Sequence, residues 1–175
     1  QSSYRILRPV KHRFGSTEDV GFFEMTQKGL KSVTNPSAKF LEEKSTAPGS
    51  VITCILEGNR PLLIEVQALA YKSVFANPVR RTSGFDSSRL QMLLAILGKR
   101  GKCNLSSHDV YVNIVGGIKI KEQAADLAVC AAIISSFKDK SFAKDTVIFG
   151  ELGLGGEVRS VSMIEKRLKE AARLG

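Results

Sequence analysis

From Val20 onward, short runs of hydrophobic residues alternate with polar and turn-forming residues, a pattern that is typical of strands joined by tight loops. Residues 21–25 and 29–33 are two such runs, and their spacing predicts a hairpin. Asn35 and Pro36 then predict the start of a short helix, because asparagine caps a helix and proline fits its first turn. We expect this helix to run to about Lys44.

A longer pair of apolar segments follows at residues 50–57 and 61–71. Gly58-Asn59-Arg60 lies between them and predicts a tight turn, so we expect the two segments to form a β-hairpin. The residue before a proline favours extended backbone. We therefore expect the second strand to continue to Asn77-Pro78.

The clearest helix is predicted over residues 86–101. Asp86 can cap its first turn, and Gly101 can end it. Its leucines recur at helical spacing and form one apolar stripe, made of Leu90, Leu93, Leu94 and Leu97. This stripe is expected to face the core.

The second half of the chain mixes both kinds of element. The pattern predicts a strand over residues 109–115, a buried helix over 122–137, strands over 146–149 and 157–161, and an amphipathic helix over 163–174. Because strands and helices are mixed and the early strands are joined by hairpins, the fold class is α/β or α+β, with a mixed sheet and packed helices.

The composition indicates one globular domain. The chain has 175 residues, of which 43% are hydrophobic and 25% charged, and this length is enough to bury a core. No apolar run approaches the roughly 18 residues that a membrane helix needs, so we expect a cytoplasmic protein without membrane contact. The chain begins with Gln1 rather than with methionine or a signal peptide, and we expect it to be a piece of a longer protein.

The cysteines and histidines do not form a metal-binding pattern. Cys54, Cys103 and Cys130 are widely spaced, and no two of them make a C-x-x-C pair. Their odd number and spacing favour reduced, buried thiols over a disulfide framework. His12 and His108 are too far apart to indicate a zinc site. We expect this chain to bind no metal or cofactor of its own.

The formal net charge of +9 makes nucleic acid a candidate partner, because cations that neutralise phosphates release condensed counterions. A basic domain with no polyanionic partner is the alternative. Six cations crowd around the helix predicted over residues 86–101, and this favours DNA. They are Arg80, Arg81, Arg89, Lys99, Arg100 and Lys102.

These cations are expected to form one surface. Since the leucine stripe faces the core, Arg89 and the cations at the helix end should face solvent together, joined by the arginine pair on the preceding loop. Basic residues also favour a helix C-terminus through the dipole, which explains Lys99 and Arg100 but not the other four. We predict sequence-independent contact with phosphates, and little base stacking, because Phe85 is the main aromatic residue nearby.

The run Lys11-His12-Arg13-Phe14-Gly15 is the most distinctive short motif. In an extended chain Lys11 and Arg13 would project to the same side, and a lysine beside an arginine suits a phosphate group, especially one presented by a neighbouring subunit. Solvated charge in a linker is the alternative interpretation.

This pentad resembles the K-N-R-F-G motif of the RadA family of bacterial DNA-repair ATPases and branch-migration helicases, with His12 in place of the usual asparagine. The likeness extends over nearly the whole chain. Further similar blocks are Asn35-Pro36-Ser37, Glu57-Gly58-Asn59-Arg60-Pro61, Glu65-Val66-Gln67-Ala68-Leu69, Gly84-Phe85-Asp86, Asn113-Ile114-Val115-Gly116-Gly117, Ala124-Ala125-Asp126-Leu127-Ala128 and Gly150-Glu151-Leu152-Gly153-Leu154.

The resemblance implies two regions. Residues 1–19 would be the end of a RecA-like ATPase region and a linker. Residues 20–175 would be similar to the proteolytic domain of Lon, with a ribosomal-protein-S5-domain-2-like fold that lacks its last strand. The sequence has no G-x-x-x-x-G-K-[ST] motif, so ATP and Mg²⁺ would bind in the upstream ATPase domain, and Zn²⁺ in an N-terminal module.

The same resemblance implies that the domain is proteolytically inactive. Lon-type proteases use a serine activated by a lysine. Alignment places Ala125 at the position of the serine and Glu165 at that of the lysine; a shift by one residue would restore Lys166 but not the serine. Substitute nucleophiles would have to be Ser135, Ser136 or Ser162, and serines at helix ends are far more often caps.

The function implied is that of a C-terminal domain of a RadA-type ATP-dependent helicase in recombinational repair and branch migration. It would build a hexameric ring and contact single-stranded or branched DNA, and RecA is a possible recombinase partner. By similarity to DnaB-type helicases, Lys11 and Arg13 would act on the neighbouring subunit's ATP. The alternatives are an oligomerisation scaffold without DNA contact and a serine peptidase with a displaced nucleophile.

Overall fold

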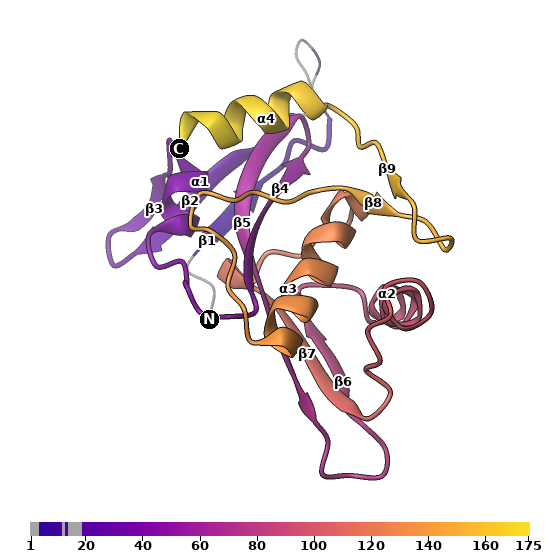
Figure 1. The fold of residues 1–175 in the computed structure, drawn as a ribbon. Coiled ribbons are helices and arrows are strands. Elements are labelled where there is room, and N and C mark those ends of the chain that lie inside the picture. Colours follow the sequence, from indigo (N-terminus) through magenta and orange to yellow (C-terminus); the bar gives the residue numbers. More distant parts are fainter. Residues whose placement is uncertain (1–3, 12, 14–18) are drawn as a thin grey trace.

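The computed structural model describes residues 4–11, 13 and 19–175 (Figure 1). At its centre lies a mixed sheet of strand order β4-β5-β7-β6. Its strands are β4 (Ser50–Glu57), β5 (Arg60–Lys72), β6 (Arg80–Ser83) and β7 (His108–Ile114). The pairs β4–β5 and β5–β7 are antiparallel, and β6 runs parallel to β7. The predicted fold class, with a mixed sheet and packed helices, is confirmed.

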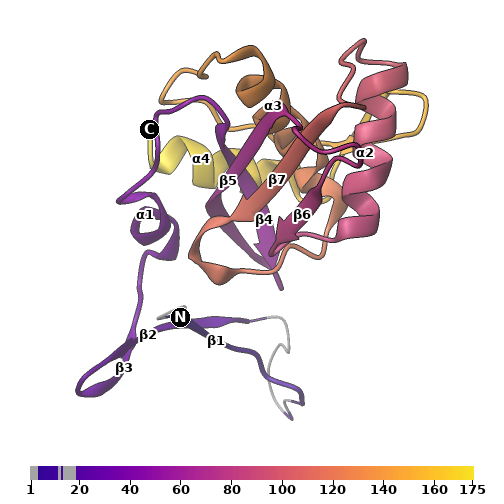
Figure 2. The ribbon, with the colours of Figure 1, turned by 90° about the horizontal axis from the view of Figure 1, so that it is seen from below.

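One face of this sheet is covered by α2 (Ser87–Lys99) and α3 (Asp126–Lys138), and α2 lies beside β6 (Figure 2). Asp86 caps α2 by accepting a hydrogen bond from the Arg89 backbone N–H, as the sequence predicts. The leucine stripe is buried except for Leu94, which is half-buried, because Ile96 takes the inward position. The core on this face also includes alternate residues of β5 and β7.

The opposite face is covered only in part. Helix α4 (Ile164–Arg173) crosses β4 and β5, where Ala171 and Leu174 pack against a small cluster of Ile52, Cys54 and Leu63. Farther along β5, and over β7 and β6, the side chains of this face are exposed or half-buried, apart from the buried carboxylates Glu65 and Asp109. We call this uncovered region the open face.

A second sheet contains β1 (Tyr4–Leu7), β2 (Gly21–Thr26) and β3 (Gly29–Ser32). Helix α1 (Pro36–Leu41) follows, capped by Asn35 as predicted, but it ends at Leu41 rather than near Lys44. Strand β1 pairs with β2, so residues before and after the predicted boundary at 19/20 share one sheet. The division into two regions stays a prediction.

Several predicted boundaries are wrong. Strand β5 ends at Lys72 and does not reach Asn77-Pro78, while the arginine pair lies on strand β6 rather than on a loop. The predicted strand over 146–149 forms a single bridge between Val147 and Ile52. The other elements of the second half are 3₁₀ helices η1 (Val115–Gly117) and η2 (Gln123–Ala125), and strands β8 (Glu151–Leu152) and β9 (Val158–Arg159).

The three cysteines are free and buried, which confirms that prediction. Burial raises the pKa of both Cys54 and Cys130 to about 12, so these thiols are poor nucleophiles. Within the part of the chain that the structure describes, no helix has the length and apolarity to cross a bilayer.

Candidate nucleic-acid interface

The six predicted DNA-contacting cations do not form one surface. Arg80 is half-buried, and its guanidinium donates to the backbone carbonyl of Leu105 at 2.8 Å and to that of His108. Leu105 lies just before β7, and His108 is the first residue of that strand. Arg80 therefore fastens these residues to β6, and most of its donors are used inside the protein.

Arg89 is also internal, and the prediction that it faces solvent is wrong. Its Nε donates to Asp126 Oδ1 at 3.0 Å, and its Nη2 donates to the other carboxylate oxygen and to the Leu152 carbonyl at 2.9 Å. The Asp126 side chain is fully buried and that of Arg89 is 15% exposed. Asp126 raises the pKa of Arg89 through this hydrogen bond, which keeps the guanidinium charged. The pair joins the first turns of α2 and α3.

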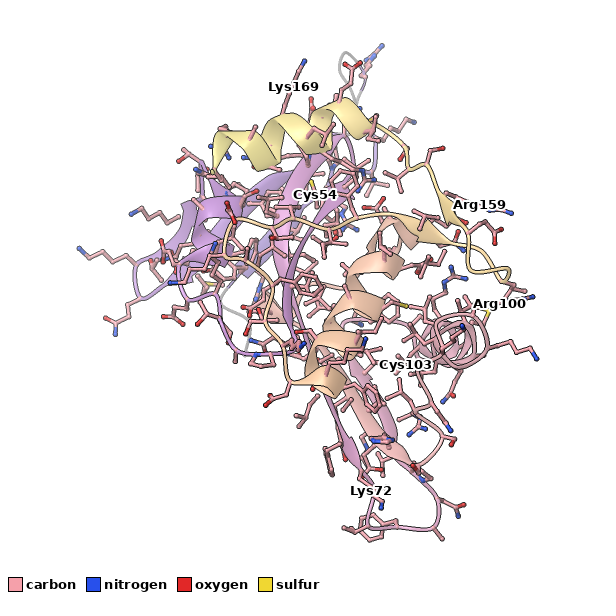
Figure 3. The ribbon with its side chains drawn as sticks, viewed as in Figure 1. Cys54, Lys72, Arg100, Cys103, Arg159 and Lys169 are labelled. Carbon is pink, nitrogen blue, oxygen red and sulfur yellow. The ribbon has the colours of Figure 1, made fainter. Side chains whose placement is uncertain are left out.

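Three of the six cations remain together at the end of α2. Lys99, Arg100 and Lys102 are all exposed, and we call them the α2-end cluster. Figure 3 shows Arg100 near the β8–β9 hairpin, and the turn of this hairpin at Gly156 packs closely against the Arg100 side chain. Helix α3 also ends with a basic residue, Lys138. The cluster can therefore present several cations to a phosphate backbone.

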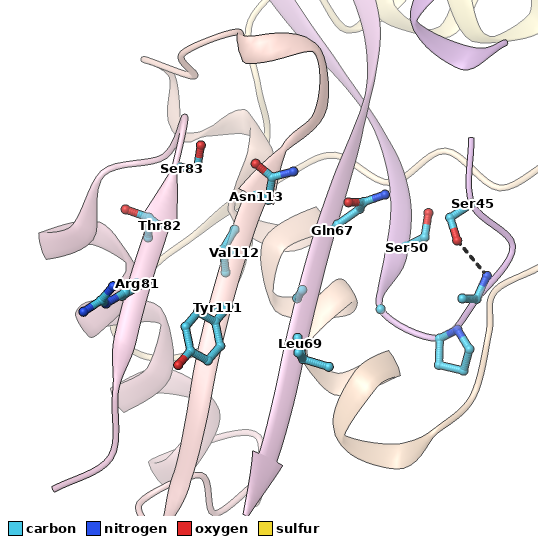
Figure 4. A pocket seen from close by; sticks show the side chains of 14 residues that line it. Ser45, Ser50, Gln67, Leu69, Arg81, Thr82, Ser83, Tyr111, Val112 and Asn113 are labelled. Atoms are coloured by element: carbon cyan, nitrogen blue, oxygen red, sulfur yellow. Dashed lines mark hydrogen bonds between the residues drawn. The ribbon is translucent and has the colours of Figure 1, made fainter. Parts of the chain in front are cut away.

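The sixth cation, Arg81, lies on the open face. Its register partner on β7 is Tyr111, which in turn lies opposite Leu69 of β5. One step along the strands, a second row is formed by Ser50, Gln67, Asn113 and Ser83. Side chains of both rows line a groove of about 450 Å³, which we call the sheet groove (Figure 4). Figure 4 shows α2 and α3 on the far side of these strands.

The rim of the sheet groove is held in place by the segment before β4. Gly49 has φ +91°, and a Cβ atom there would lie 2.1 Å from the Ala68 carbonyl oxygen, so only glycine fits. The buried Glu65 carboxylate accepts hydrogen bonds from the Ser45 backbone N–H, the Ser50 hydroxyl and the Gln67 amide. These contacts turn the Glu65 carboxylate inward and order the rim.

Two tyrosines extend the open face. The rings of Tyr71 and Tyr111 are nearly parallel, with an interplanar angle of 7° and centroids 6.2 Å apart. The Tyr111 hydroxyl favours the protonated form of its neighbour and, with a smaller contribution from desolvation, raises the pKa of Tyr71 to about 12. The Tyr71 phenol therefore stays neutral near pH 7. Tyr71 is 43% exposed, which is high for an aromatic side chain on a central sheet strand.

The two positions aligned with the Lon dyad differ in environment. Ala125 is fully buried before the first turn of α3, and Glu165 is exposed on α4. The same two segments are joined instead by an ion pair. Arg167 is fully buried and donates to both oxygens of Glu122, at 2.9 and 2.6 Å, and to the Cys54 carbonyl at 2.6 Å.

The serines considered as substitute nucleophiles have structural contacts. The Ser135 hydroxyl accepts from the Gly49 N–H at 2.8 Å and donates to the Lys140 carbonyl at 2.5 Å. The Ser136 hydroxyl accepts from the Ala70 N–H at 2.9 Å, beyond the point where β4 stops pairing with β5. Ser162 gives its backbone carbonyl to Arg167. Each of these serines has a role in holding the backbone.

The predicted phosphate motif is described only in part. Lys11 and Arg13 are exposed. His12, Phe14 and Gly15 lie outside the described residues, so the geometry of the motif stays a prediction.

Four groove residues were not predicted from the sequence: Gln67, Leu69, Tyr111 and Asn113. Strict alternation along residues 109–114 was a usable signal, since Tyr111 and Asn113 fall out of phase with Val110, Val112 and Ile114. Which strands bring these residues together follows only from the sheet order.

The chain is similar over nearly its whole length to proteins named DNA repair protein RadA. It is 52% identical over 172 residues to the protein named DNA repair protein RadA of Aquifex aeolicus, and 51% identical over 172 residues to that of Pseudomonas aeruginosa. It is 49% identical over 174 residues to the RadA of Bacillus subtilis. These alignments cover 98–99% of this chain but only 38–39% of each relative, so the chain spans about two fifths of their length.

A family model described as subunit ChlI of Mg-chelatase matches residues 86–175. This match begins at the cap of α2 and runs through β7, α3 and the β8–β9 hairpin to the end of α4. It covers just over half of the chain. The protein therefore belongs to the family described as subunit ChlI of Mg-chelatase, and its homologues over nearly its whole length are proteins named DNA repair protein RadA.

Proposed function

We propose that this chain is the C-terminal, Lon-like domain of a RadA-type ATP-dependent DNA helicase that acts in recombinational repair and branch migration. The observation that carries the proposal is identity near 50% to proteins named DNA repair protein RadA over nearly the whole chain. ATP and Mg²⁺ would bind in an upstream ATPase domain and Zn²⁺ in an N-terminal module. The domain would build a hexameric ring in the cytoplasm, with RecA as a possible partner.

In this proposal DNA meets the α2-end cluster. Arg80 and Arg89 are removed from the interface because their guanidinium groups are used internally. Lys99, Arg100 and Lys102 keep their charges at the surface, and six copies in a ring would add through multivalency. Contacts to phosphates from lysine and arginine carry little sequence information, so binding would be sequence-independent.

The test is DNA binding across a salt series, with oligomeric state recorded in parallel. The triple variant Lys99→Glu, Arg100→Glu, Lys102→Glu is compared with a control of equal charge change, Lys28→Glu, Lys31→Glu, Lys169→Glu, whose cations are exposed elsewhere. Because each phosphate contact adds about 0.7–0.9 to the log–log slope, the first variant should lower the slope by about 2–3, and the control should leave it unchanged.

Equal binding by the two variants would move the phosphate contact away from α2. If an assembled wild-type protein bound no DNA at all, the oligomerisation scaffold would replace the DNA-binding function. Labelling by a serine-reactive probe would support the peptidase alternative, and we expect none, because alanine stands at the aligned nucleophile position.

The motif residues Lys11 and Arg13 would stabilise charge on the γ-phosphate of the neighbouring subunit. Full-length protein carrying Lys11→Ala and Arg13→Ala should still bind nucleotide in its own site and still assemble, but it should hydrolyse ATP at least about 10-fold more slowly. Wild-type hydrolysis by the double variant would leave the motif as linker charge.

A further inference from the structure

We propose that the sheet groove binds one unpaired nucleotide of a single-stranded nucleic acid, with its base against Tyr111 and Leu69 and its phosphate at Arg81. This goes beyond the phosphate contacts of the α2-end cluster, because it assigns a second site, on a different face of the molecule, to the unstacked base. The proposed site is independent of the direction in which DNA would enter a ring.

The charge of the groove favours an anion. Arg81 is the only charged residue among those that line the groove in the described part of the chain. It is exposed, and it makes no hydrogen bond or ion pair with any residue that the structure describes. Two carboxylates lie on this face of the sheet, and both are buried: Asp109, two residues from Tyr111 on β7, accepts from the Val79 backbone N–H at 2.6 Å, and Glu65 is held inward by three donors. A phosphate that reaches Arg81 therefore meets a guanidinium that no described residue uses, and no carboxylate lines the groove beside it.

The surface beside Arg81 suits a flat apolar ligand. Leu69 is 55% exposed, and Tyr111 lies between it and Arg81 across the strands. Exposed aromatic side chains on a sheet are the usual platform for unstacked bases, since every base offers a π-face. Because Arg81 and Tyr111 are register partners, base and phosphate of one nucleotide can be held at adjacent positions.

Amide side chains supply the remaining polar contacts. Gln67 and Asn113 are register partners on β5 and β7, one step from Leu69 and Tyr111. Gln67 donates its Nε2 to Glu65 at 3.0 Å, which leaves its amide oxygen as an acceptor. Asn113 is exposed and can both donate and accept. Their position suits the edge of a base whose face rests on Tyr111.

The size of the groove limits the ligand to an unpaired base. Its volume of about 450 Å³ is within the range of sites for small ligands. A duplex keeps its bases stacked inside the helix, so it cannot offer a base face to Tyr111. The groove therefore distinguishes single-stranded from duplex DNA, which phosphate contacts alone do less well.

The experiment uses tyrosine fluorescence, because the chain has no tryptophan and only three tyrosines. Oligothymidine and a duplex of the same length are titrated into the wild type and into Tyr111→Ala, Arg81→Ala and the control Tyr111→Phe. We expect oligothymidine to quench the wild type and to bind Tyr111→Ala about 10-fold or more weakly. Tyr111→Phe keeps the ring and should bind within about 2-fold of the wild type.

Two further measurements separate this site from the α2-end cluster and from misfolding. Ultraviolet cross-linking of oligothymidine, followed by peptide mapping, should label the segment around Tyr111. The triple glutamate variant of the α2-end cluster should lose affinity for both oligothymidine and duplex, whereas the groove variants should lose affinity for oligothymidine alone. Thermal unfolding should show that each groove variant is folded at the temperature of the titration, with Tyr111→Ala somewhat less stable because it loses the contact with Tyr71.

The proposal is overturned if Tyr111→Ala and Arg81→Ala bind oligothymidine as the wild type does, even where the α2-end variant fails. It is also overturned if the groove variants change the assembled mass and leave nucleic-acid binding intact, since the groove would then be an interface between copies. If thymidine monophosphate bound as tightly as the oligonucleotide, the ligand of the groove would be a free nucleotide and not a nucleic-acid strand.

Discussion

The two faces of the central sheet use their charges differently, and two adjacent arginines of β6 show how. Arg80 lies on the side of Val110, and its guanidinium is used by the carbonyls of Leu105 and His108. Arg81 lies on the side of Tyr111 and is exposed. The covered face uses cations to satisfy internal acceptors, while the open face keeps one for solvent or a ligand. Charge in a sequence becomes a binding argument only when the partner of each cation is known.

The same contrast holds for apolar residues. Leu93 of α2 is fully buried against the covered face, and Leu69 of β5 is 55% exposed on the open face. Burial of a leucine contributes about 1.5–3 kcal/mol of transfer free energy, so only Leu93 stabilises the fold to that extent. Leu69 remains available for a contact outside the domain.

The largest loss of stability is expected when the ion pair between α2 and α3, Arg89–Asp126, is broken. Arg89→Ala leaves the Asp126 carboxylate buried without its partner and should lower the free energy of unfolding by about 3–5 kcal/mol, measured by urea denaturation. Lys99→Ala on the same helix is the control and should change it by less than about 0.5 kcal/mol. If Arg89→Ala were as stable as Lys99→Ala, Arg89 would be a surface cation after all.

A matched pair of leucines tests the burial difference directly. Leu93→Ala should cost about 2–5 kcal/mol, because the core keeps most of the resulting cavity. Leu69→Ala should cost less than about 1 kcal/mol, since more than half of its side chain is already exposed to water. Similar losses for both, again from urea denaturation, would show that the open face is covered in solution.

Arg80 and Arg81 should differ less in what they contribute to the free energy of unfolding. Arg80→Ala removes charge-assisted hydrogen bonds to two carbonyls and should cost about 1.5–3 kcal/mol. Arg81→Ala should stay within about 0.5 kcal/mol of the wild type. Thermal unfolding at fixed pH checks both. A large loss for Arg81→Ala would assign this residue a structural partner and remove it from the groove's chemistry.

The smallest expected effect is a change in the pKa of Tyr71, which is followed by absorbance. The pKa of Tyr71, raised to about 12 mainly by the Tyr111 hydroxyl, should fall toward 10.0 in Tyr111→Phe, followed by phenolate absorbance at 295 nm. Since the raised pKa favours the folded state with Tyr71 protonated, the stability it contributes is present below pH 10 and is lost as the pH rises toward 12. An unchanged pKa in Tyr111→Phe would mean that the two rings do not interact through their hydroxyls.

Much of the local structure followed from the sequence. Asn35 and Asp86 both cap helices as predicted, because capping depends on groups within three residues of each other. The hairpin around Gly58-Asn59 was also correct, since a glycine-containing turn between two apolar runs leaves few alternatives. Strand and helix boundaries were less accurate where distant contacts decide them, as at Lys72 and Val147.

The candidate site was predicted less well than the fold. Helical periodicity placed the leucines of α2 toward the core, but it could not foresee that Arg89 would turn to Asp126, which is 37 residues away. It grouped Arg80 with Arg81 because they are adjacent, although adjacent strand residues face opposite sides. It gave no sign of the sheet groove, whose lining comes from four strands and the segment before β4.

By itself the sequence determined the fold class, the order of the main elements, their caps and the likeness to RadA proteins. Each of these depends on the identity of residues or on periodicity within one segment. Only the tertiary structure decided which cations are free, because an ion pair such as Arg89–Asp126 forms where two helices pack, and packing relates residues that are distant along the chain. The same dependence on packing created the open face, where α4 covers one end of the sheet and leaves Arg81 and Tyr111 uncovered.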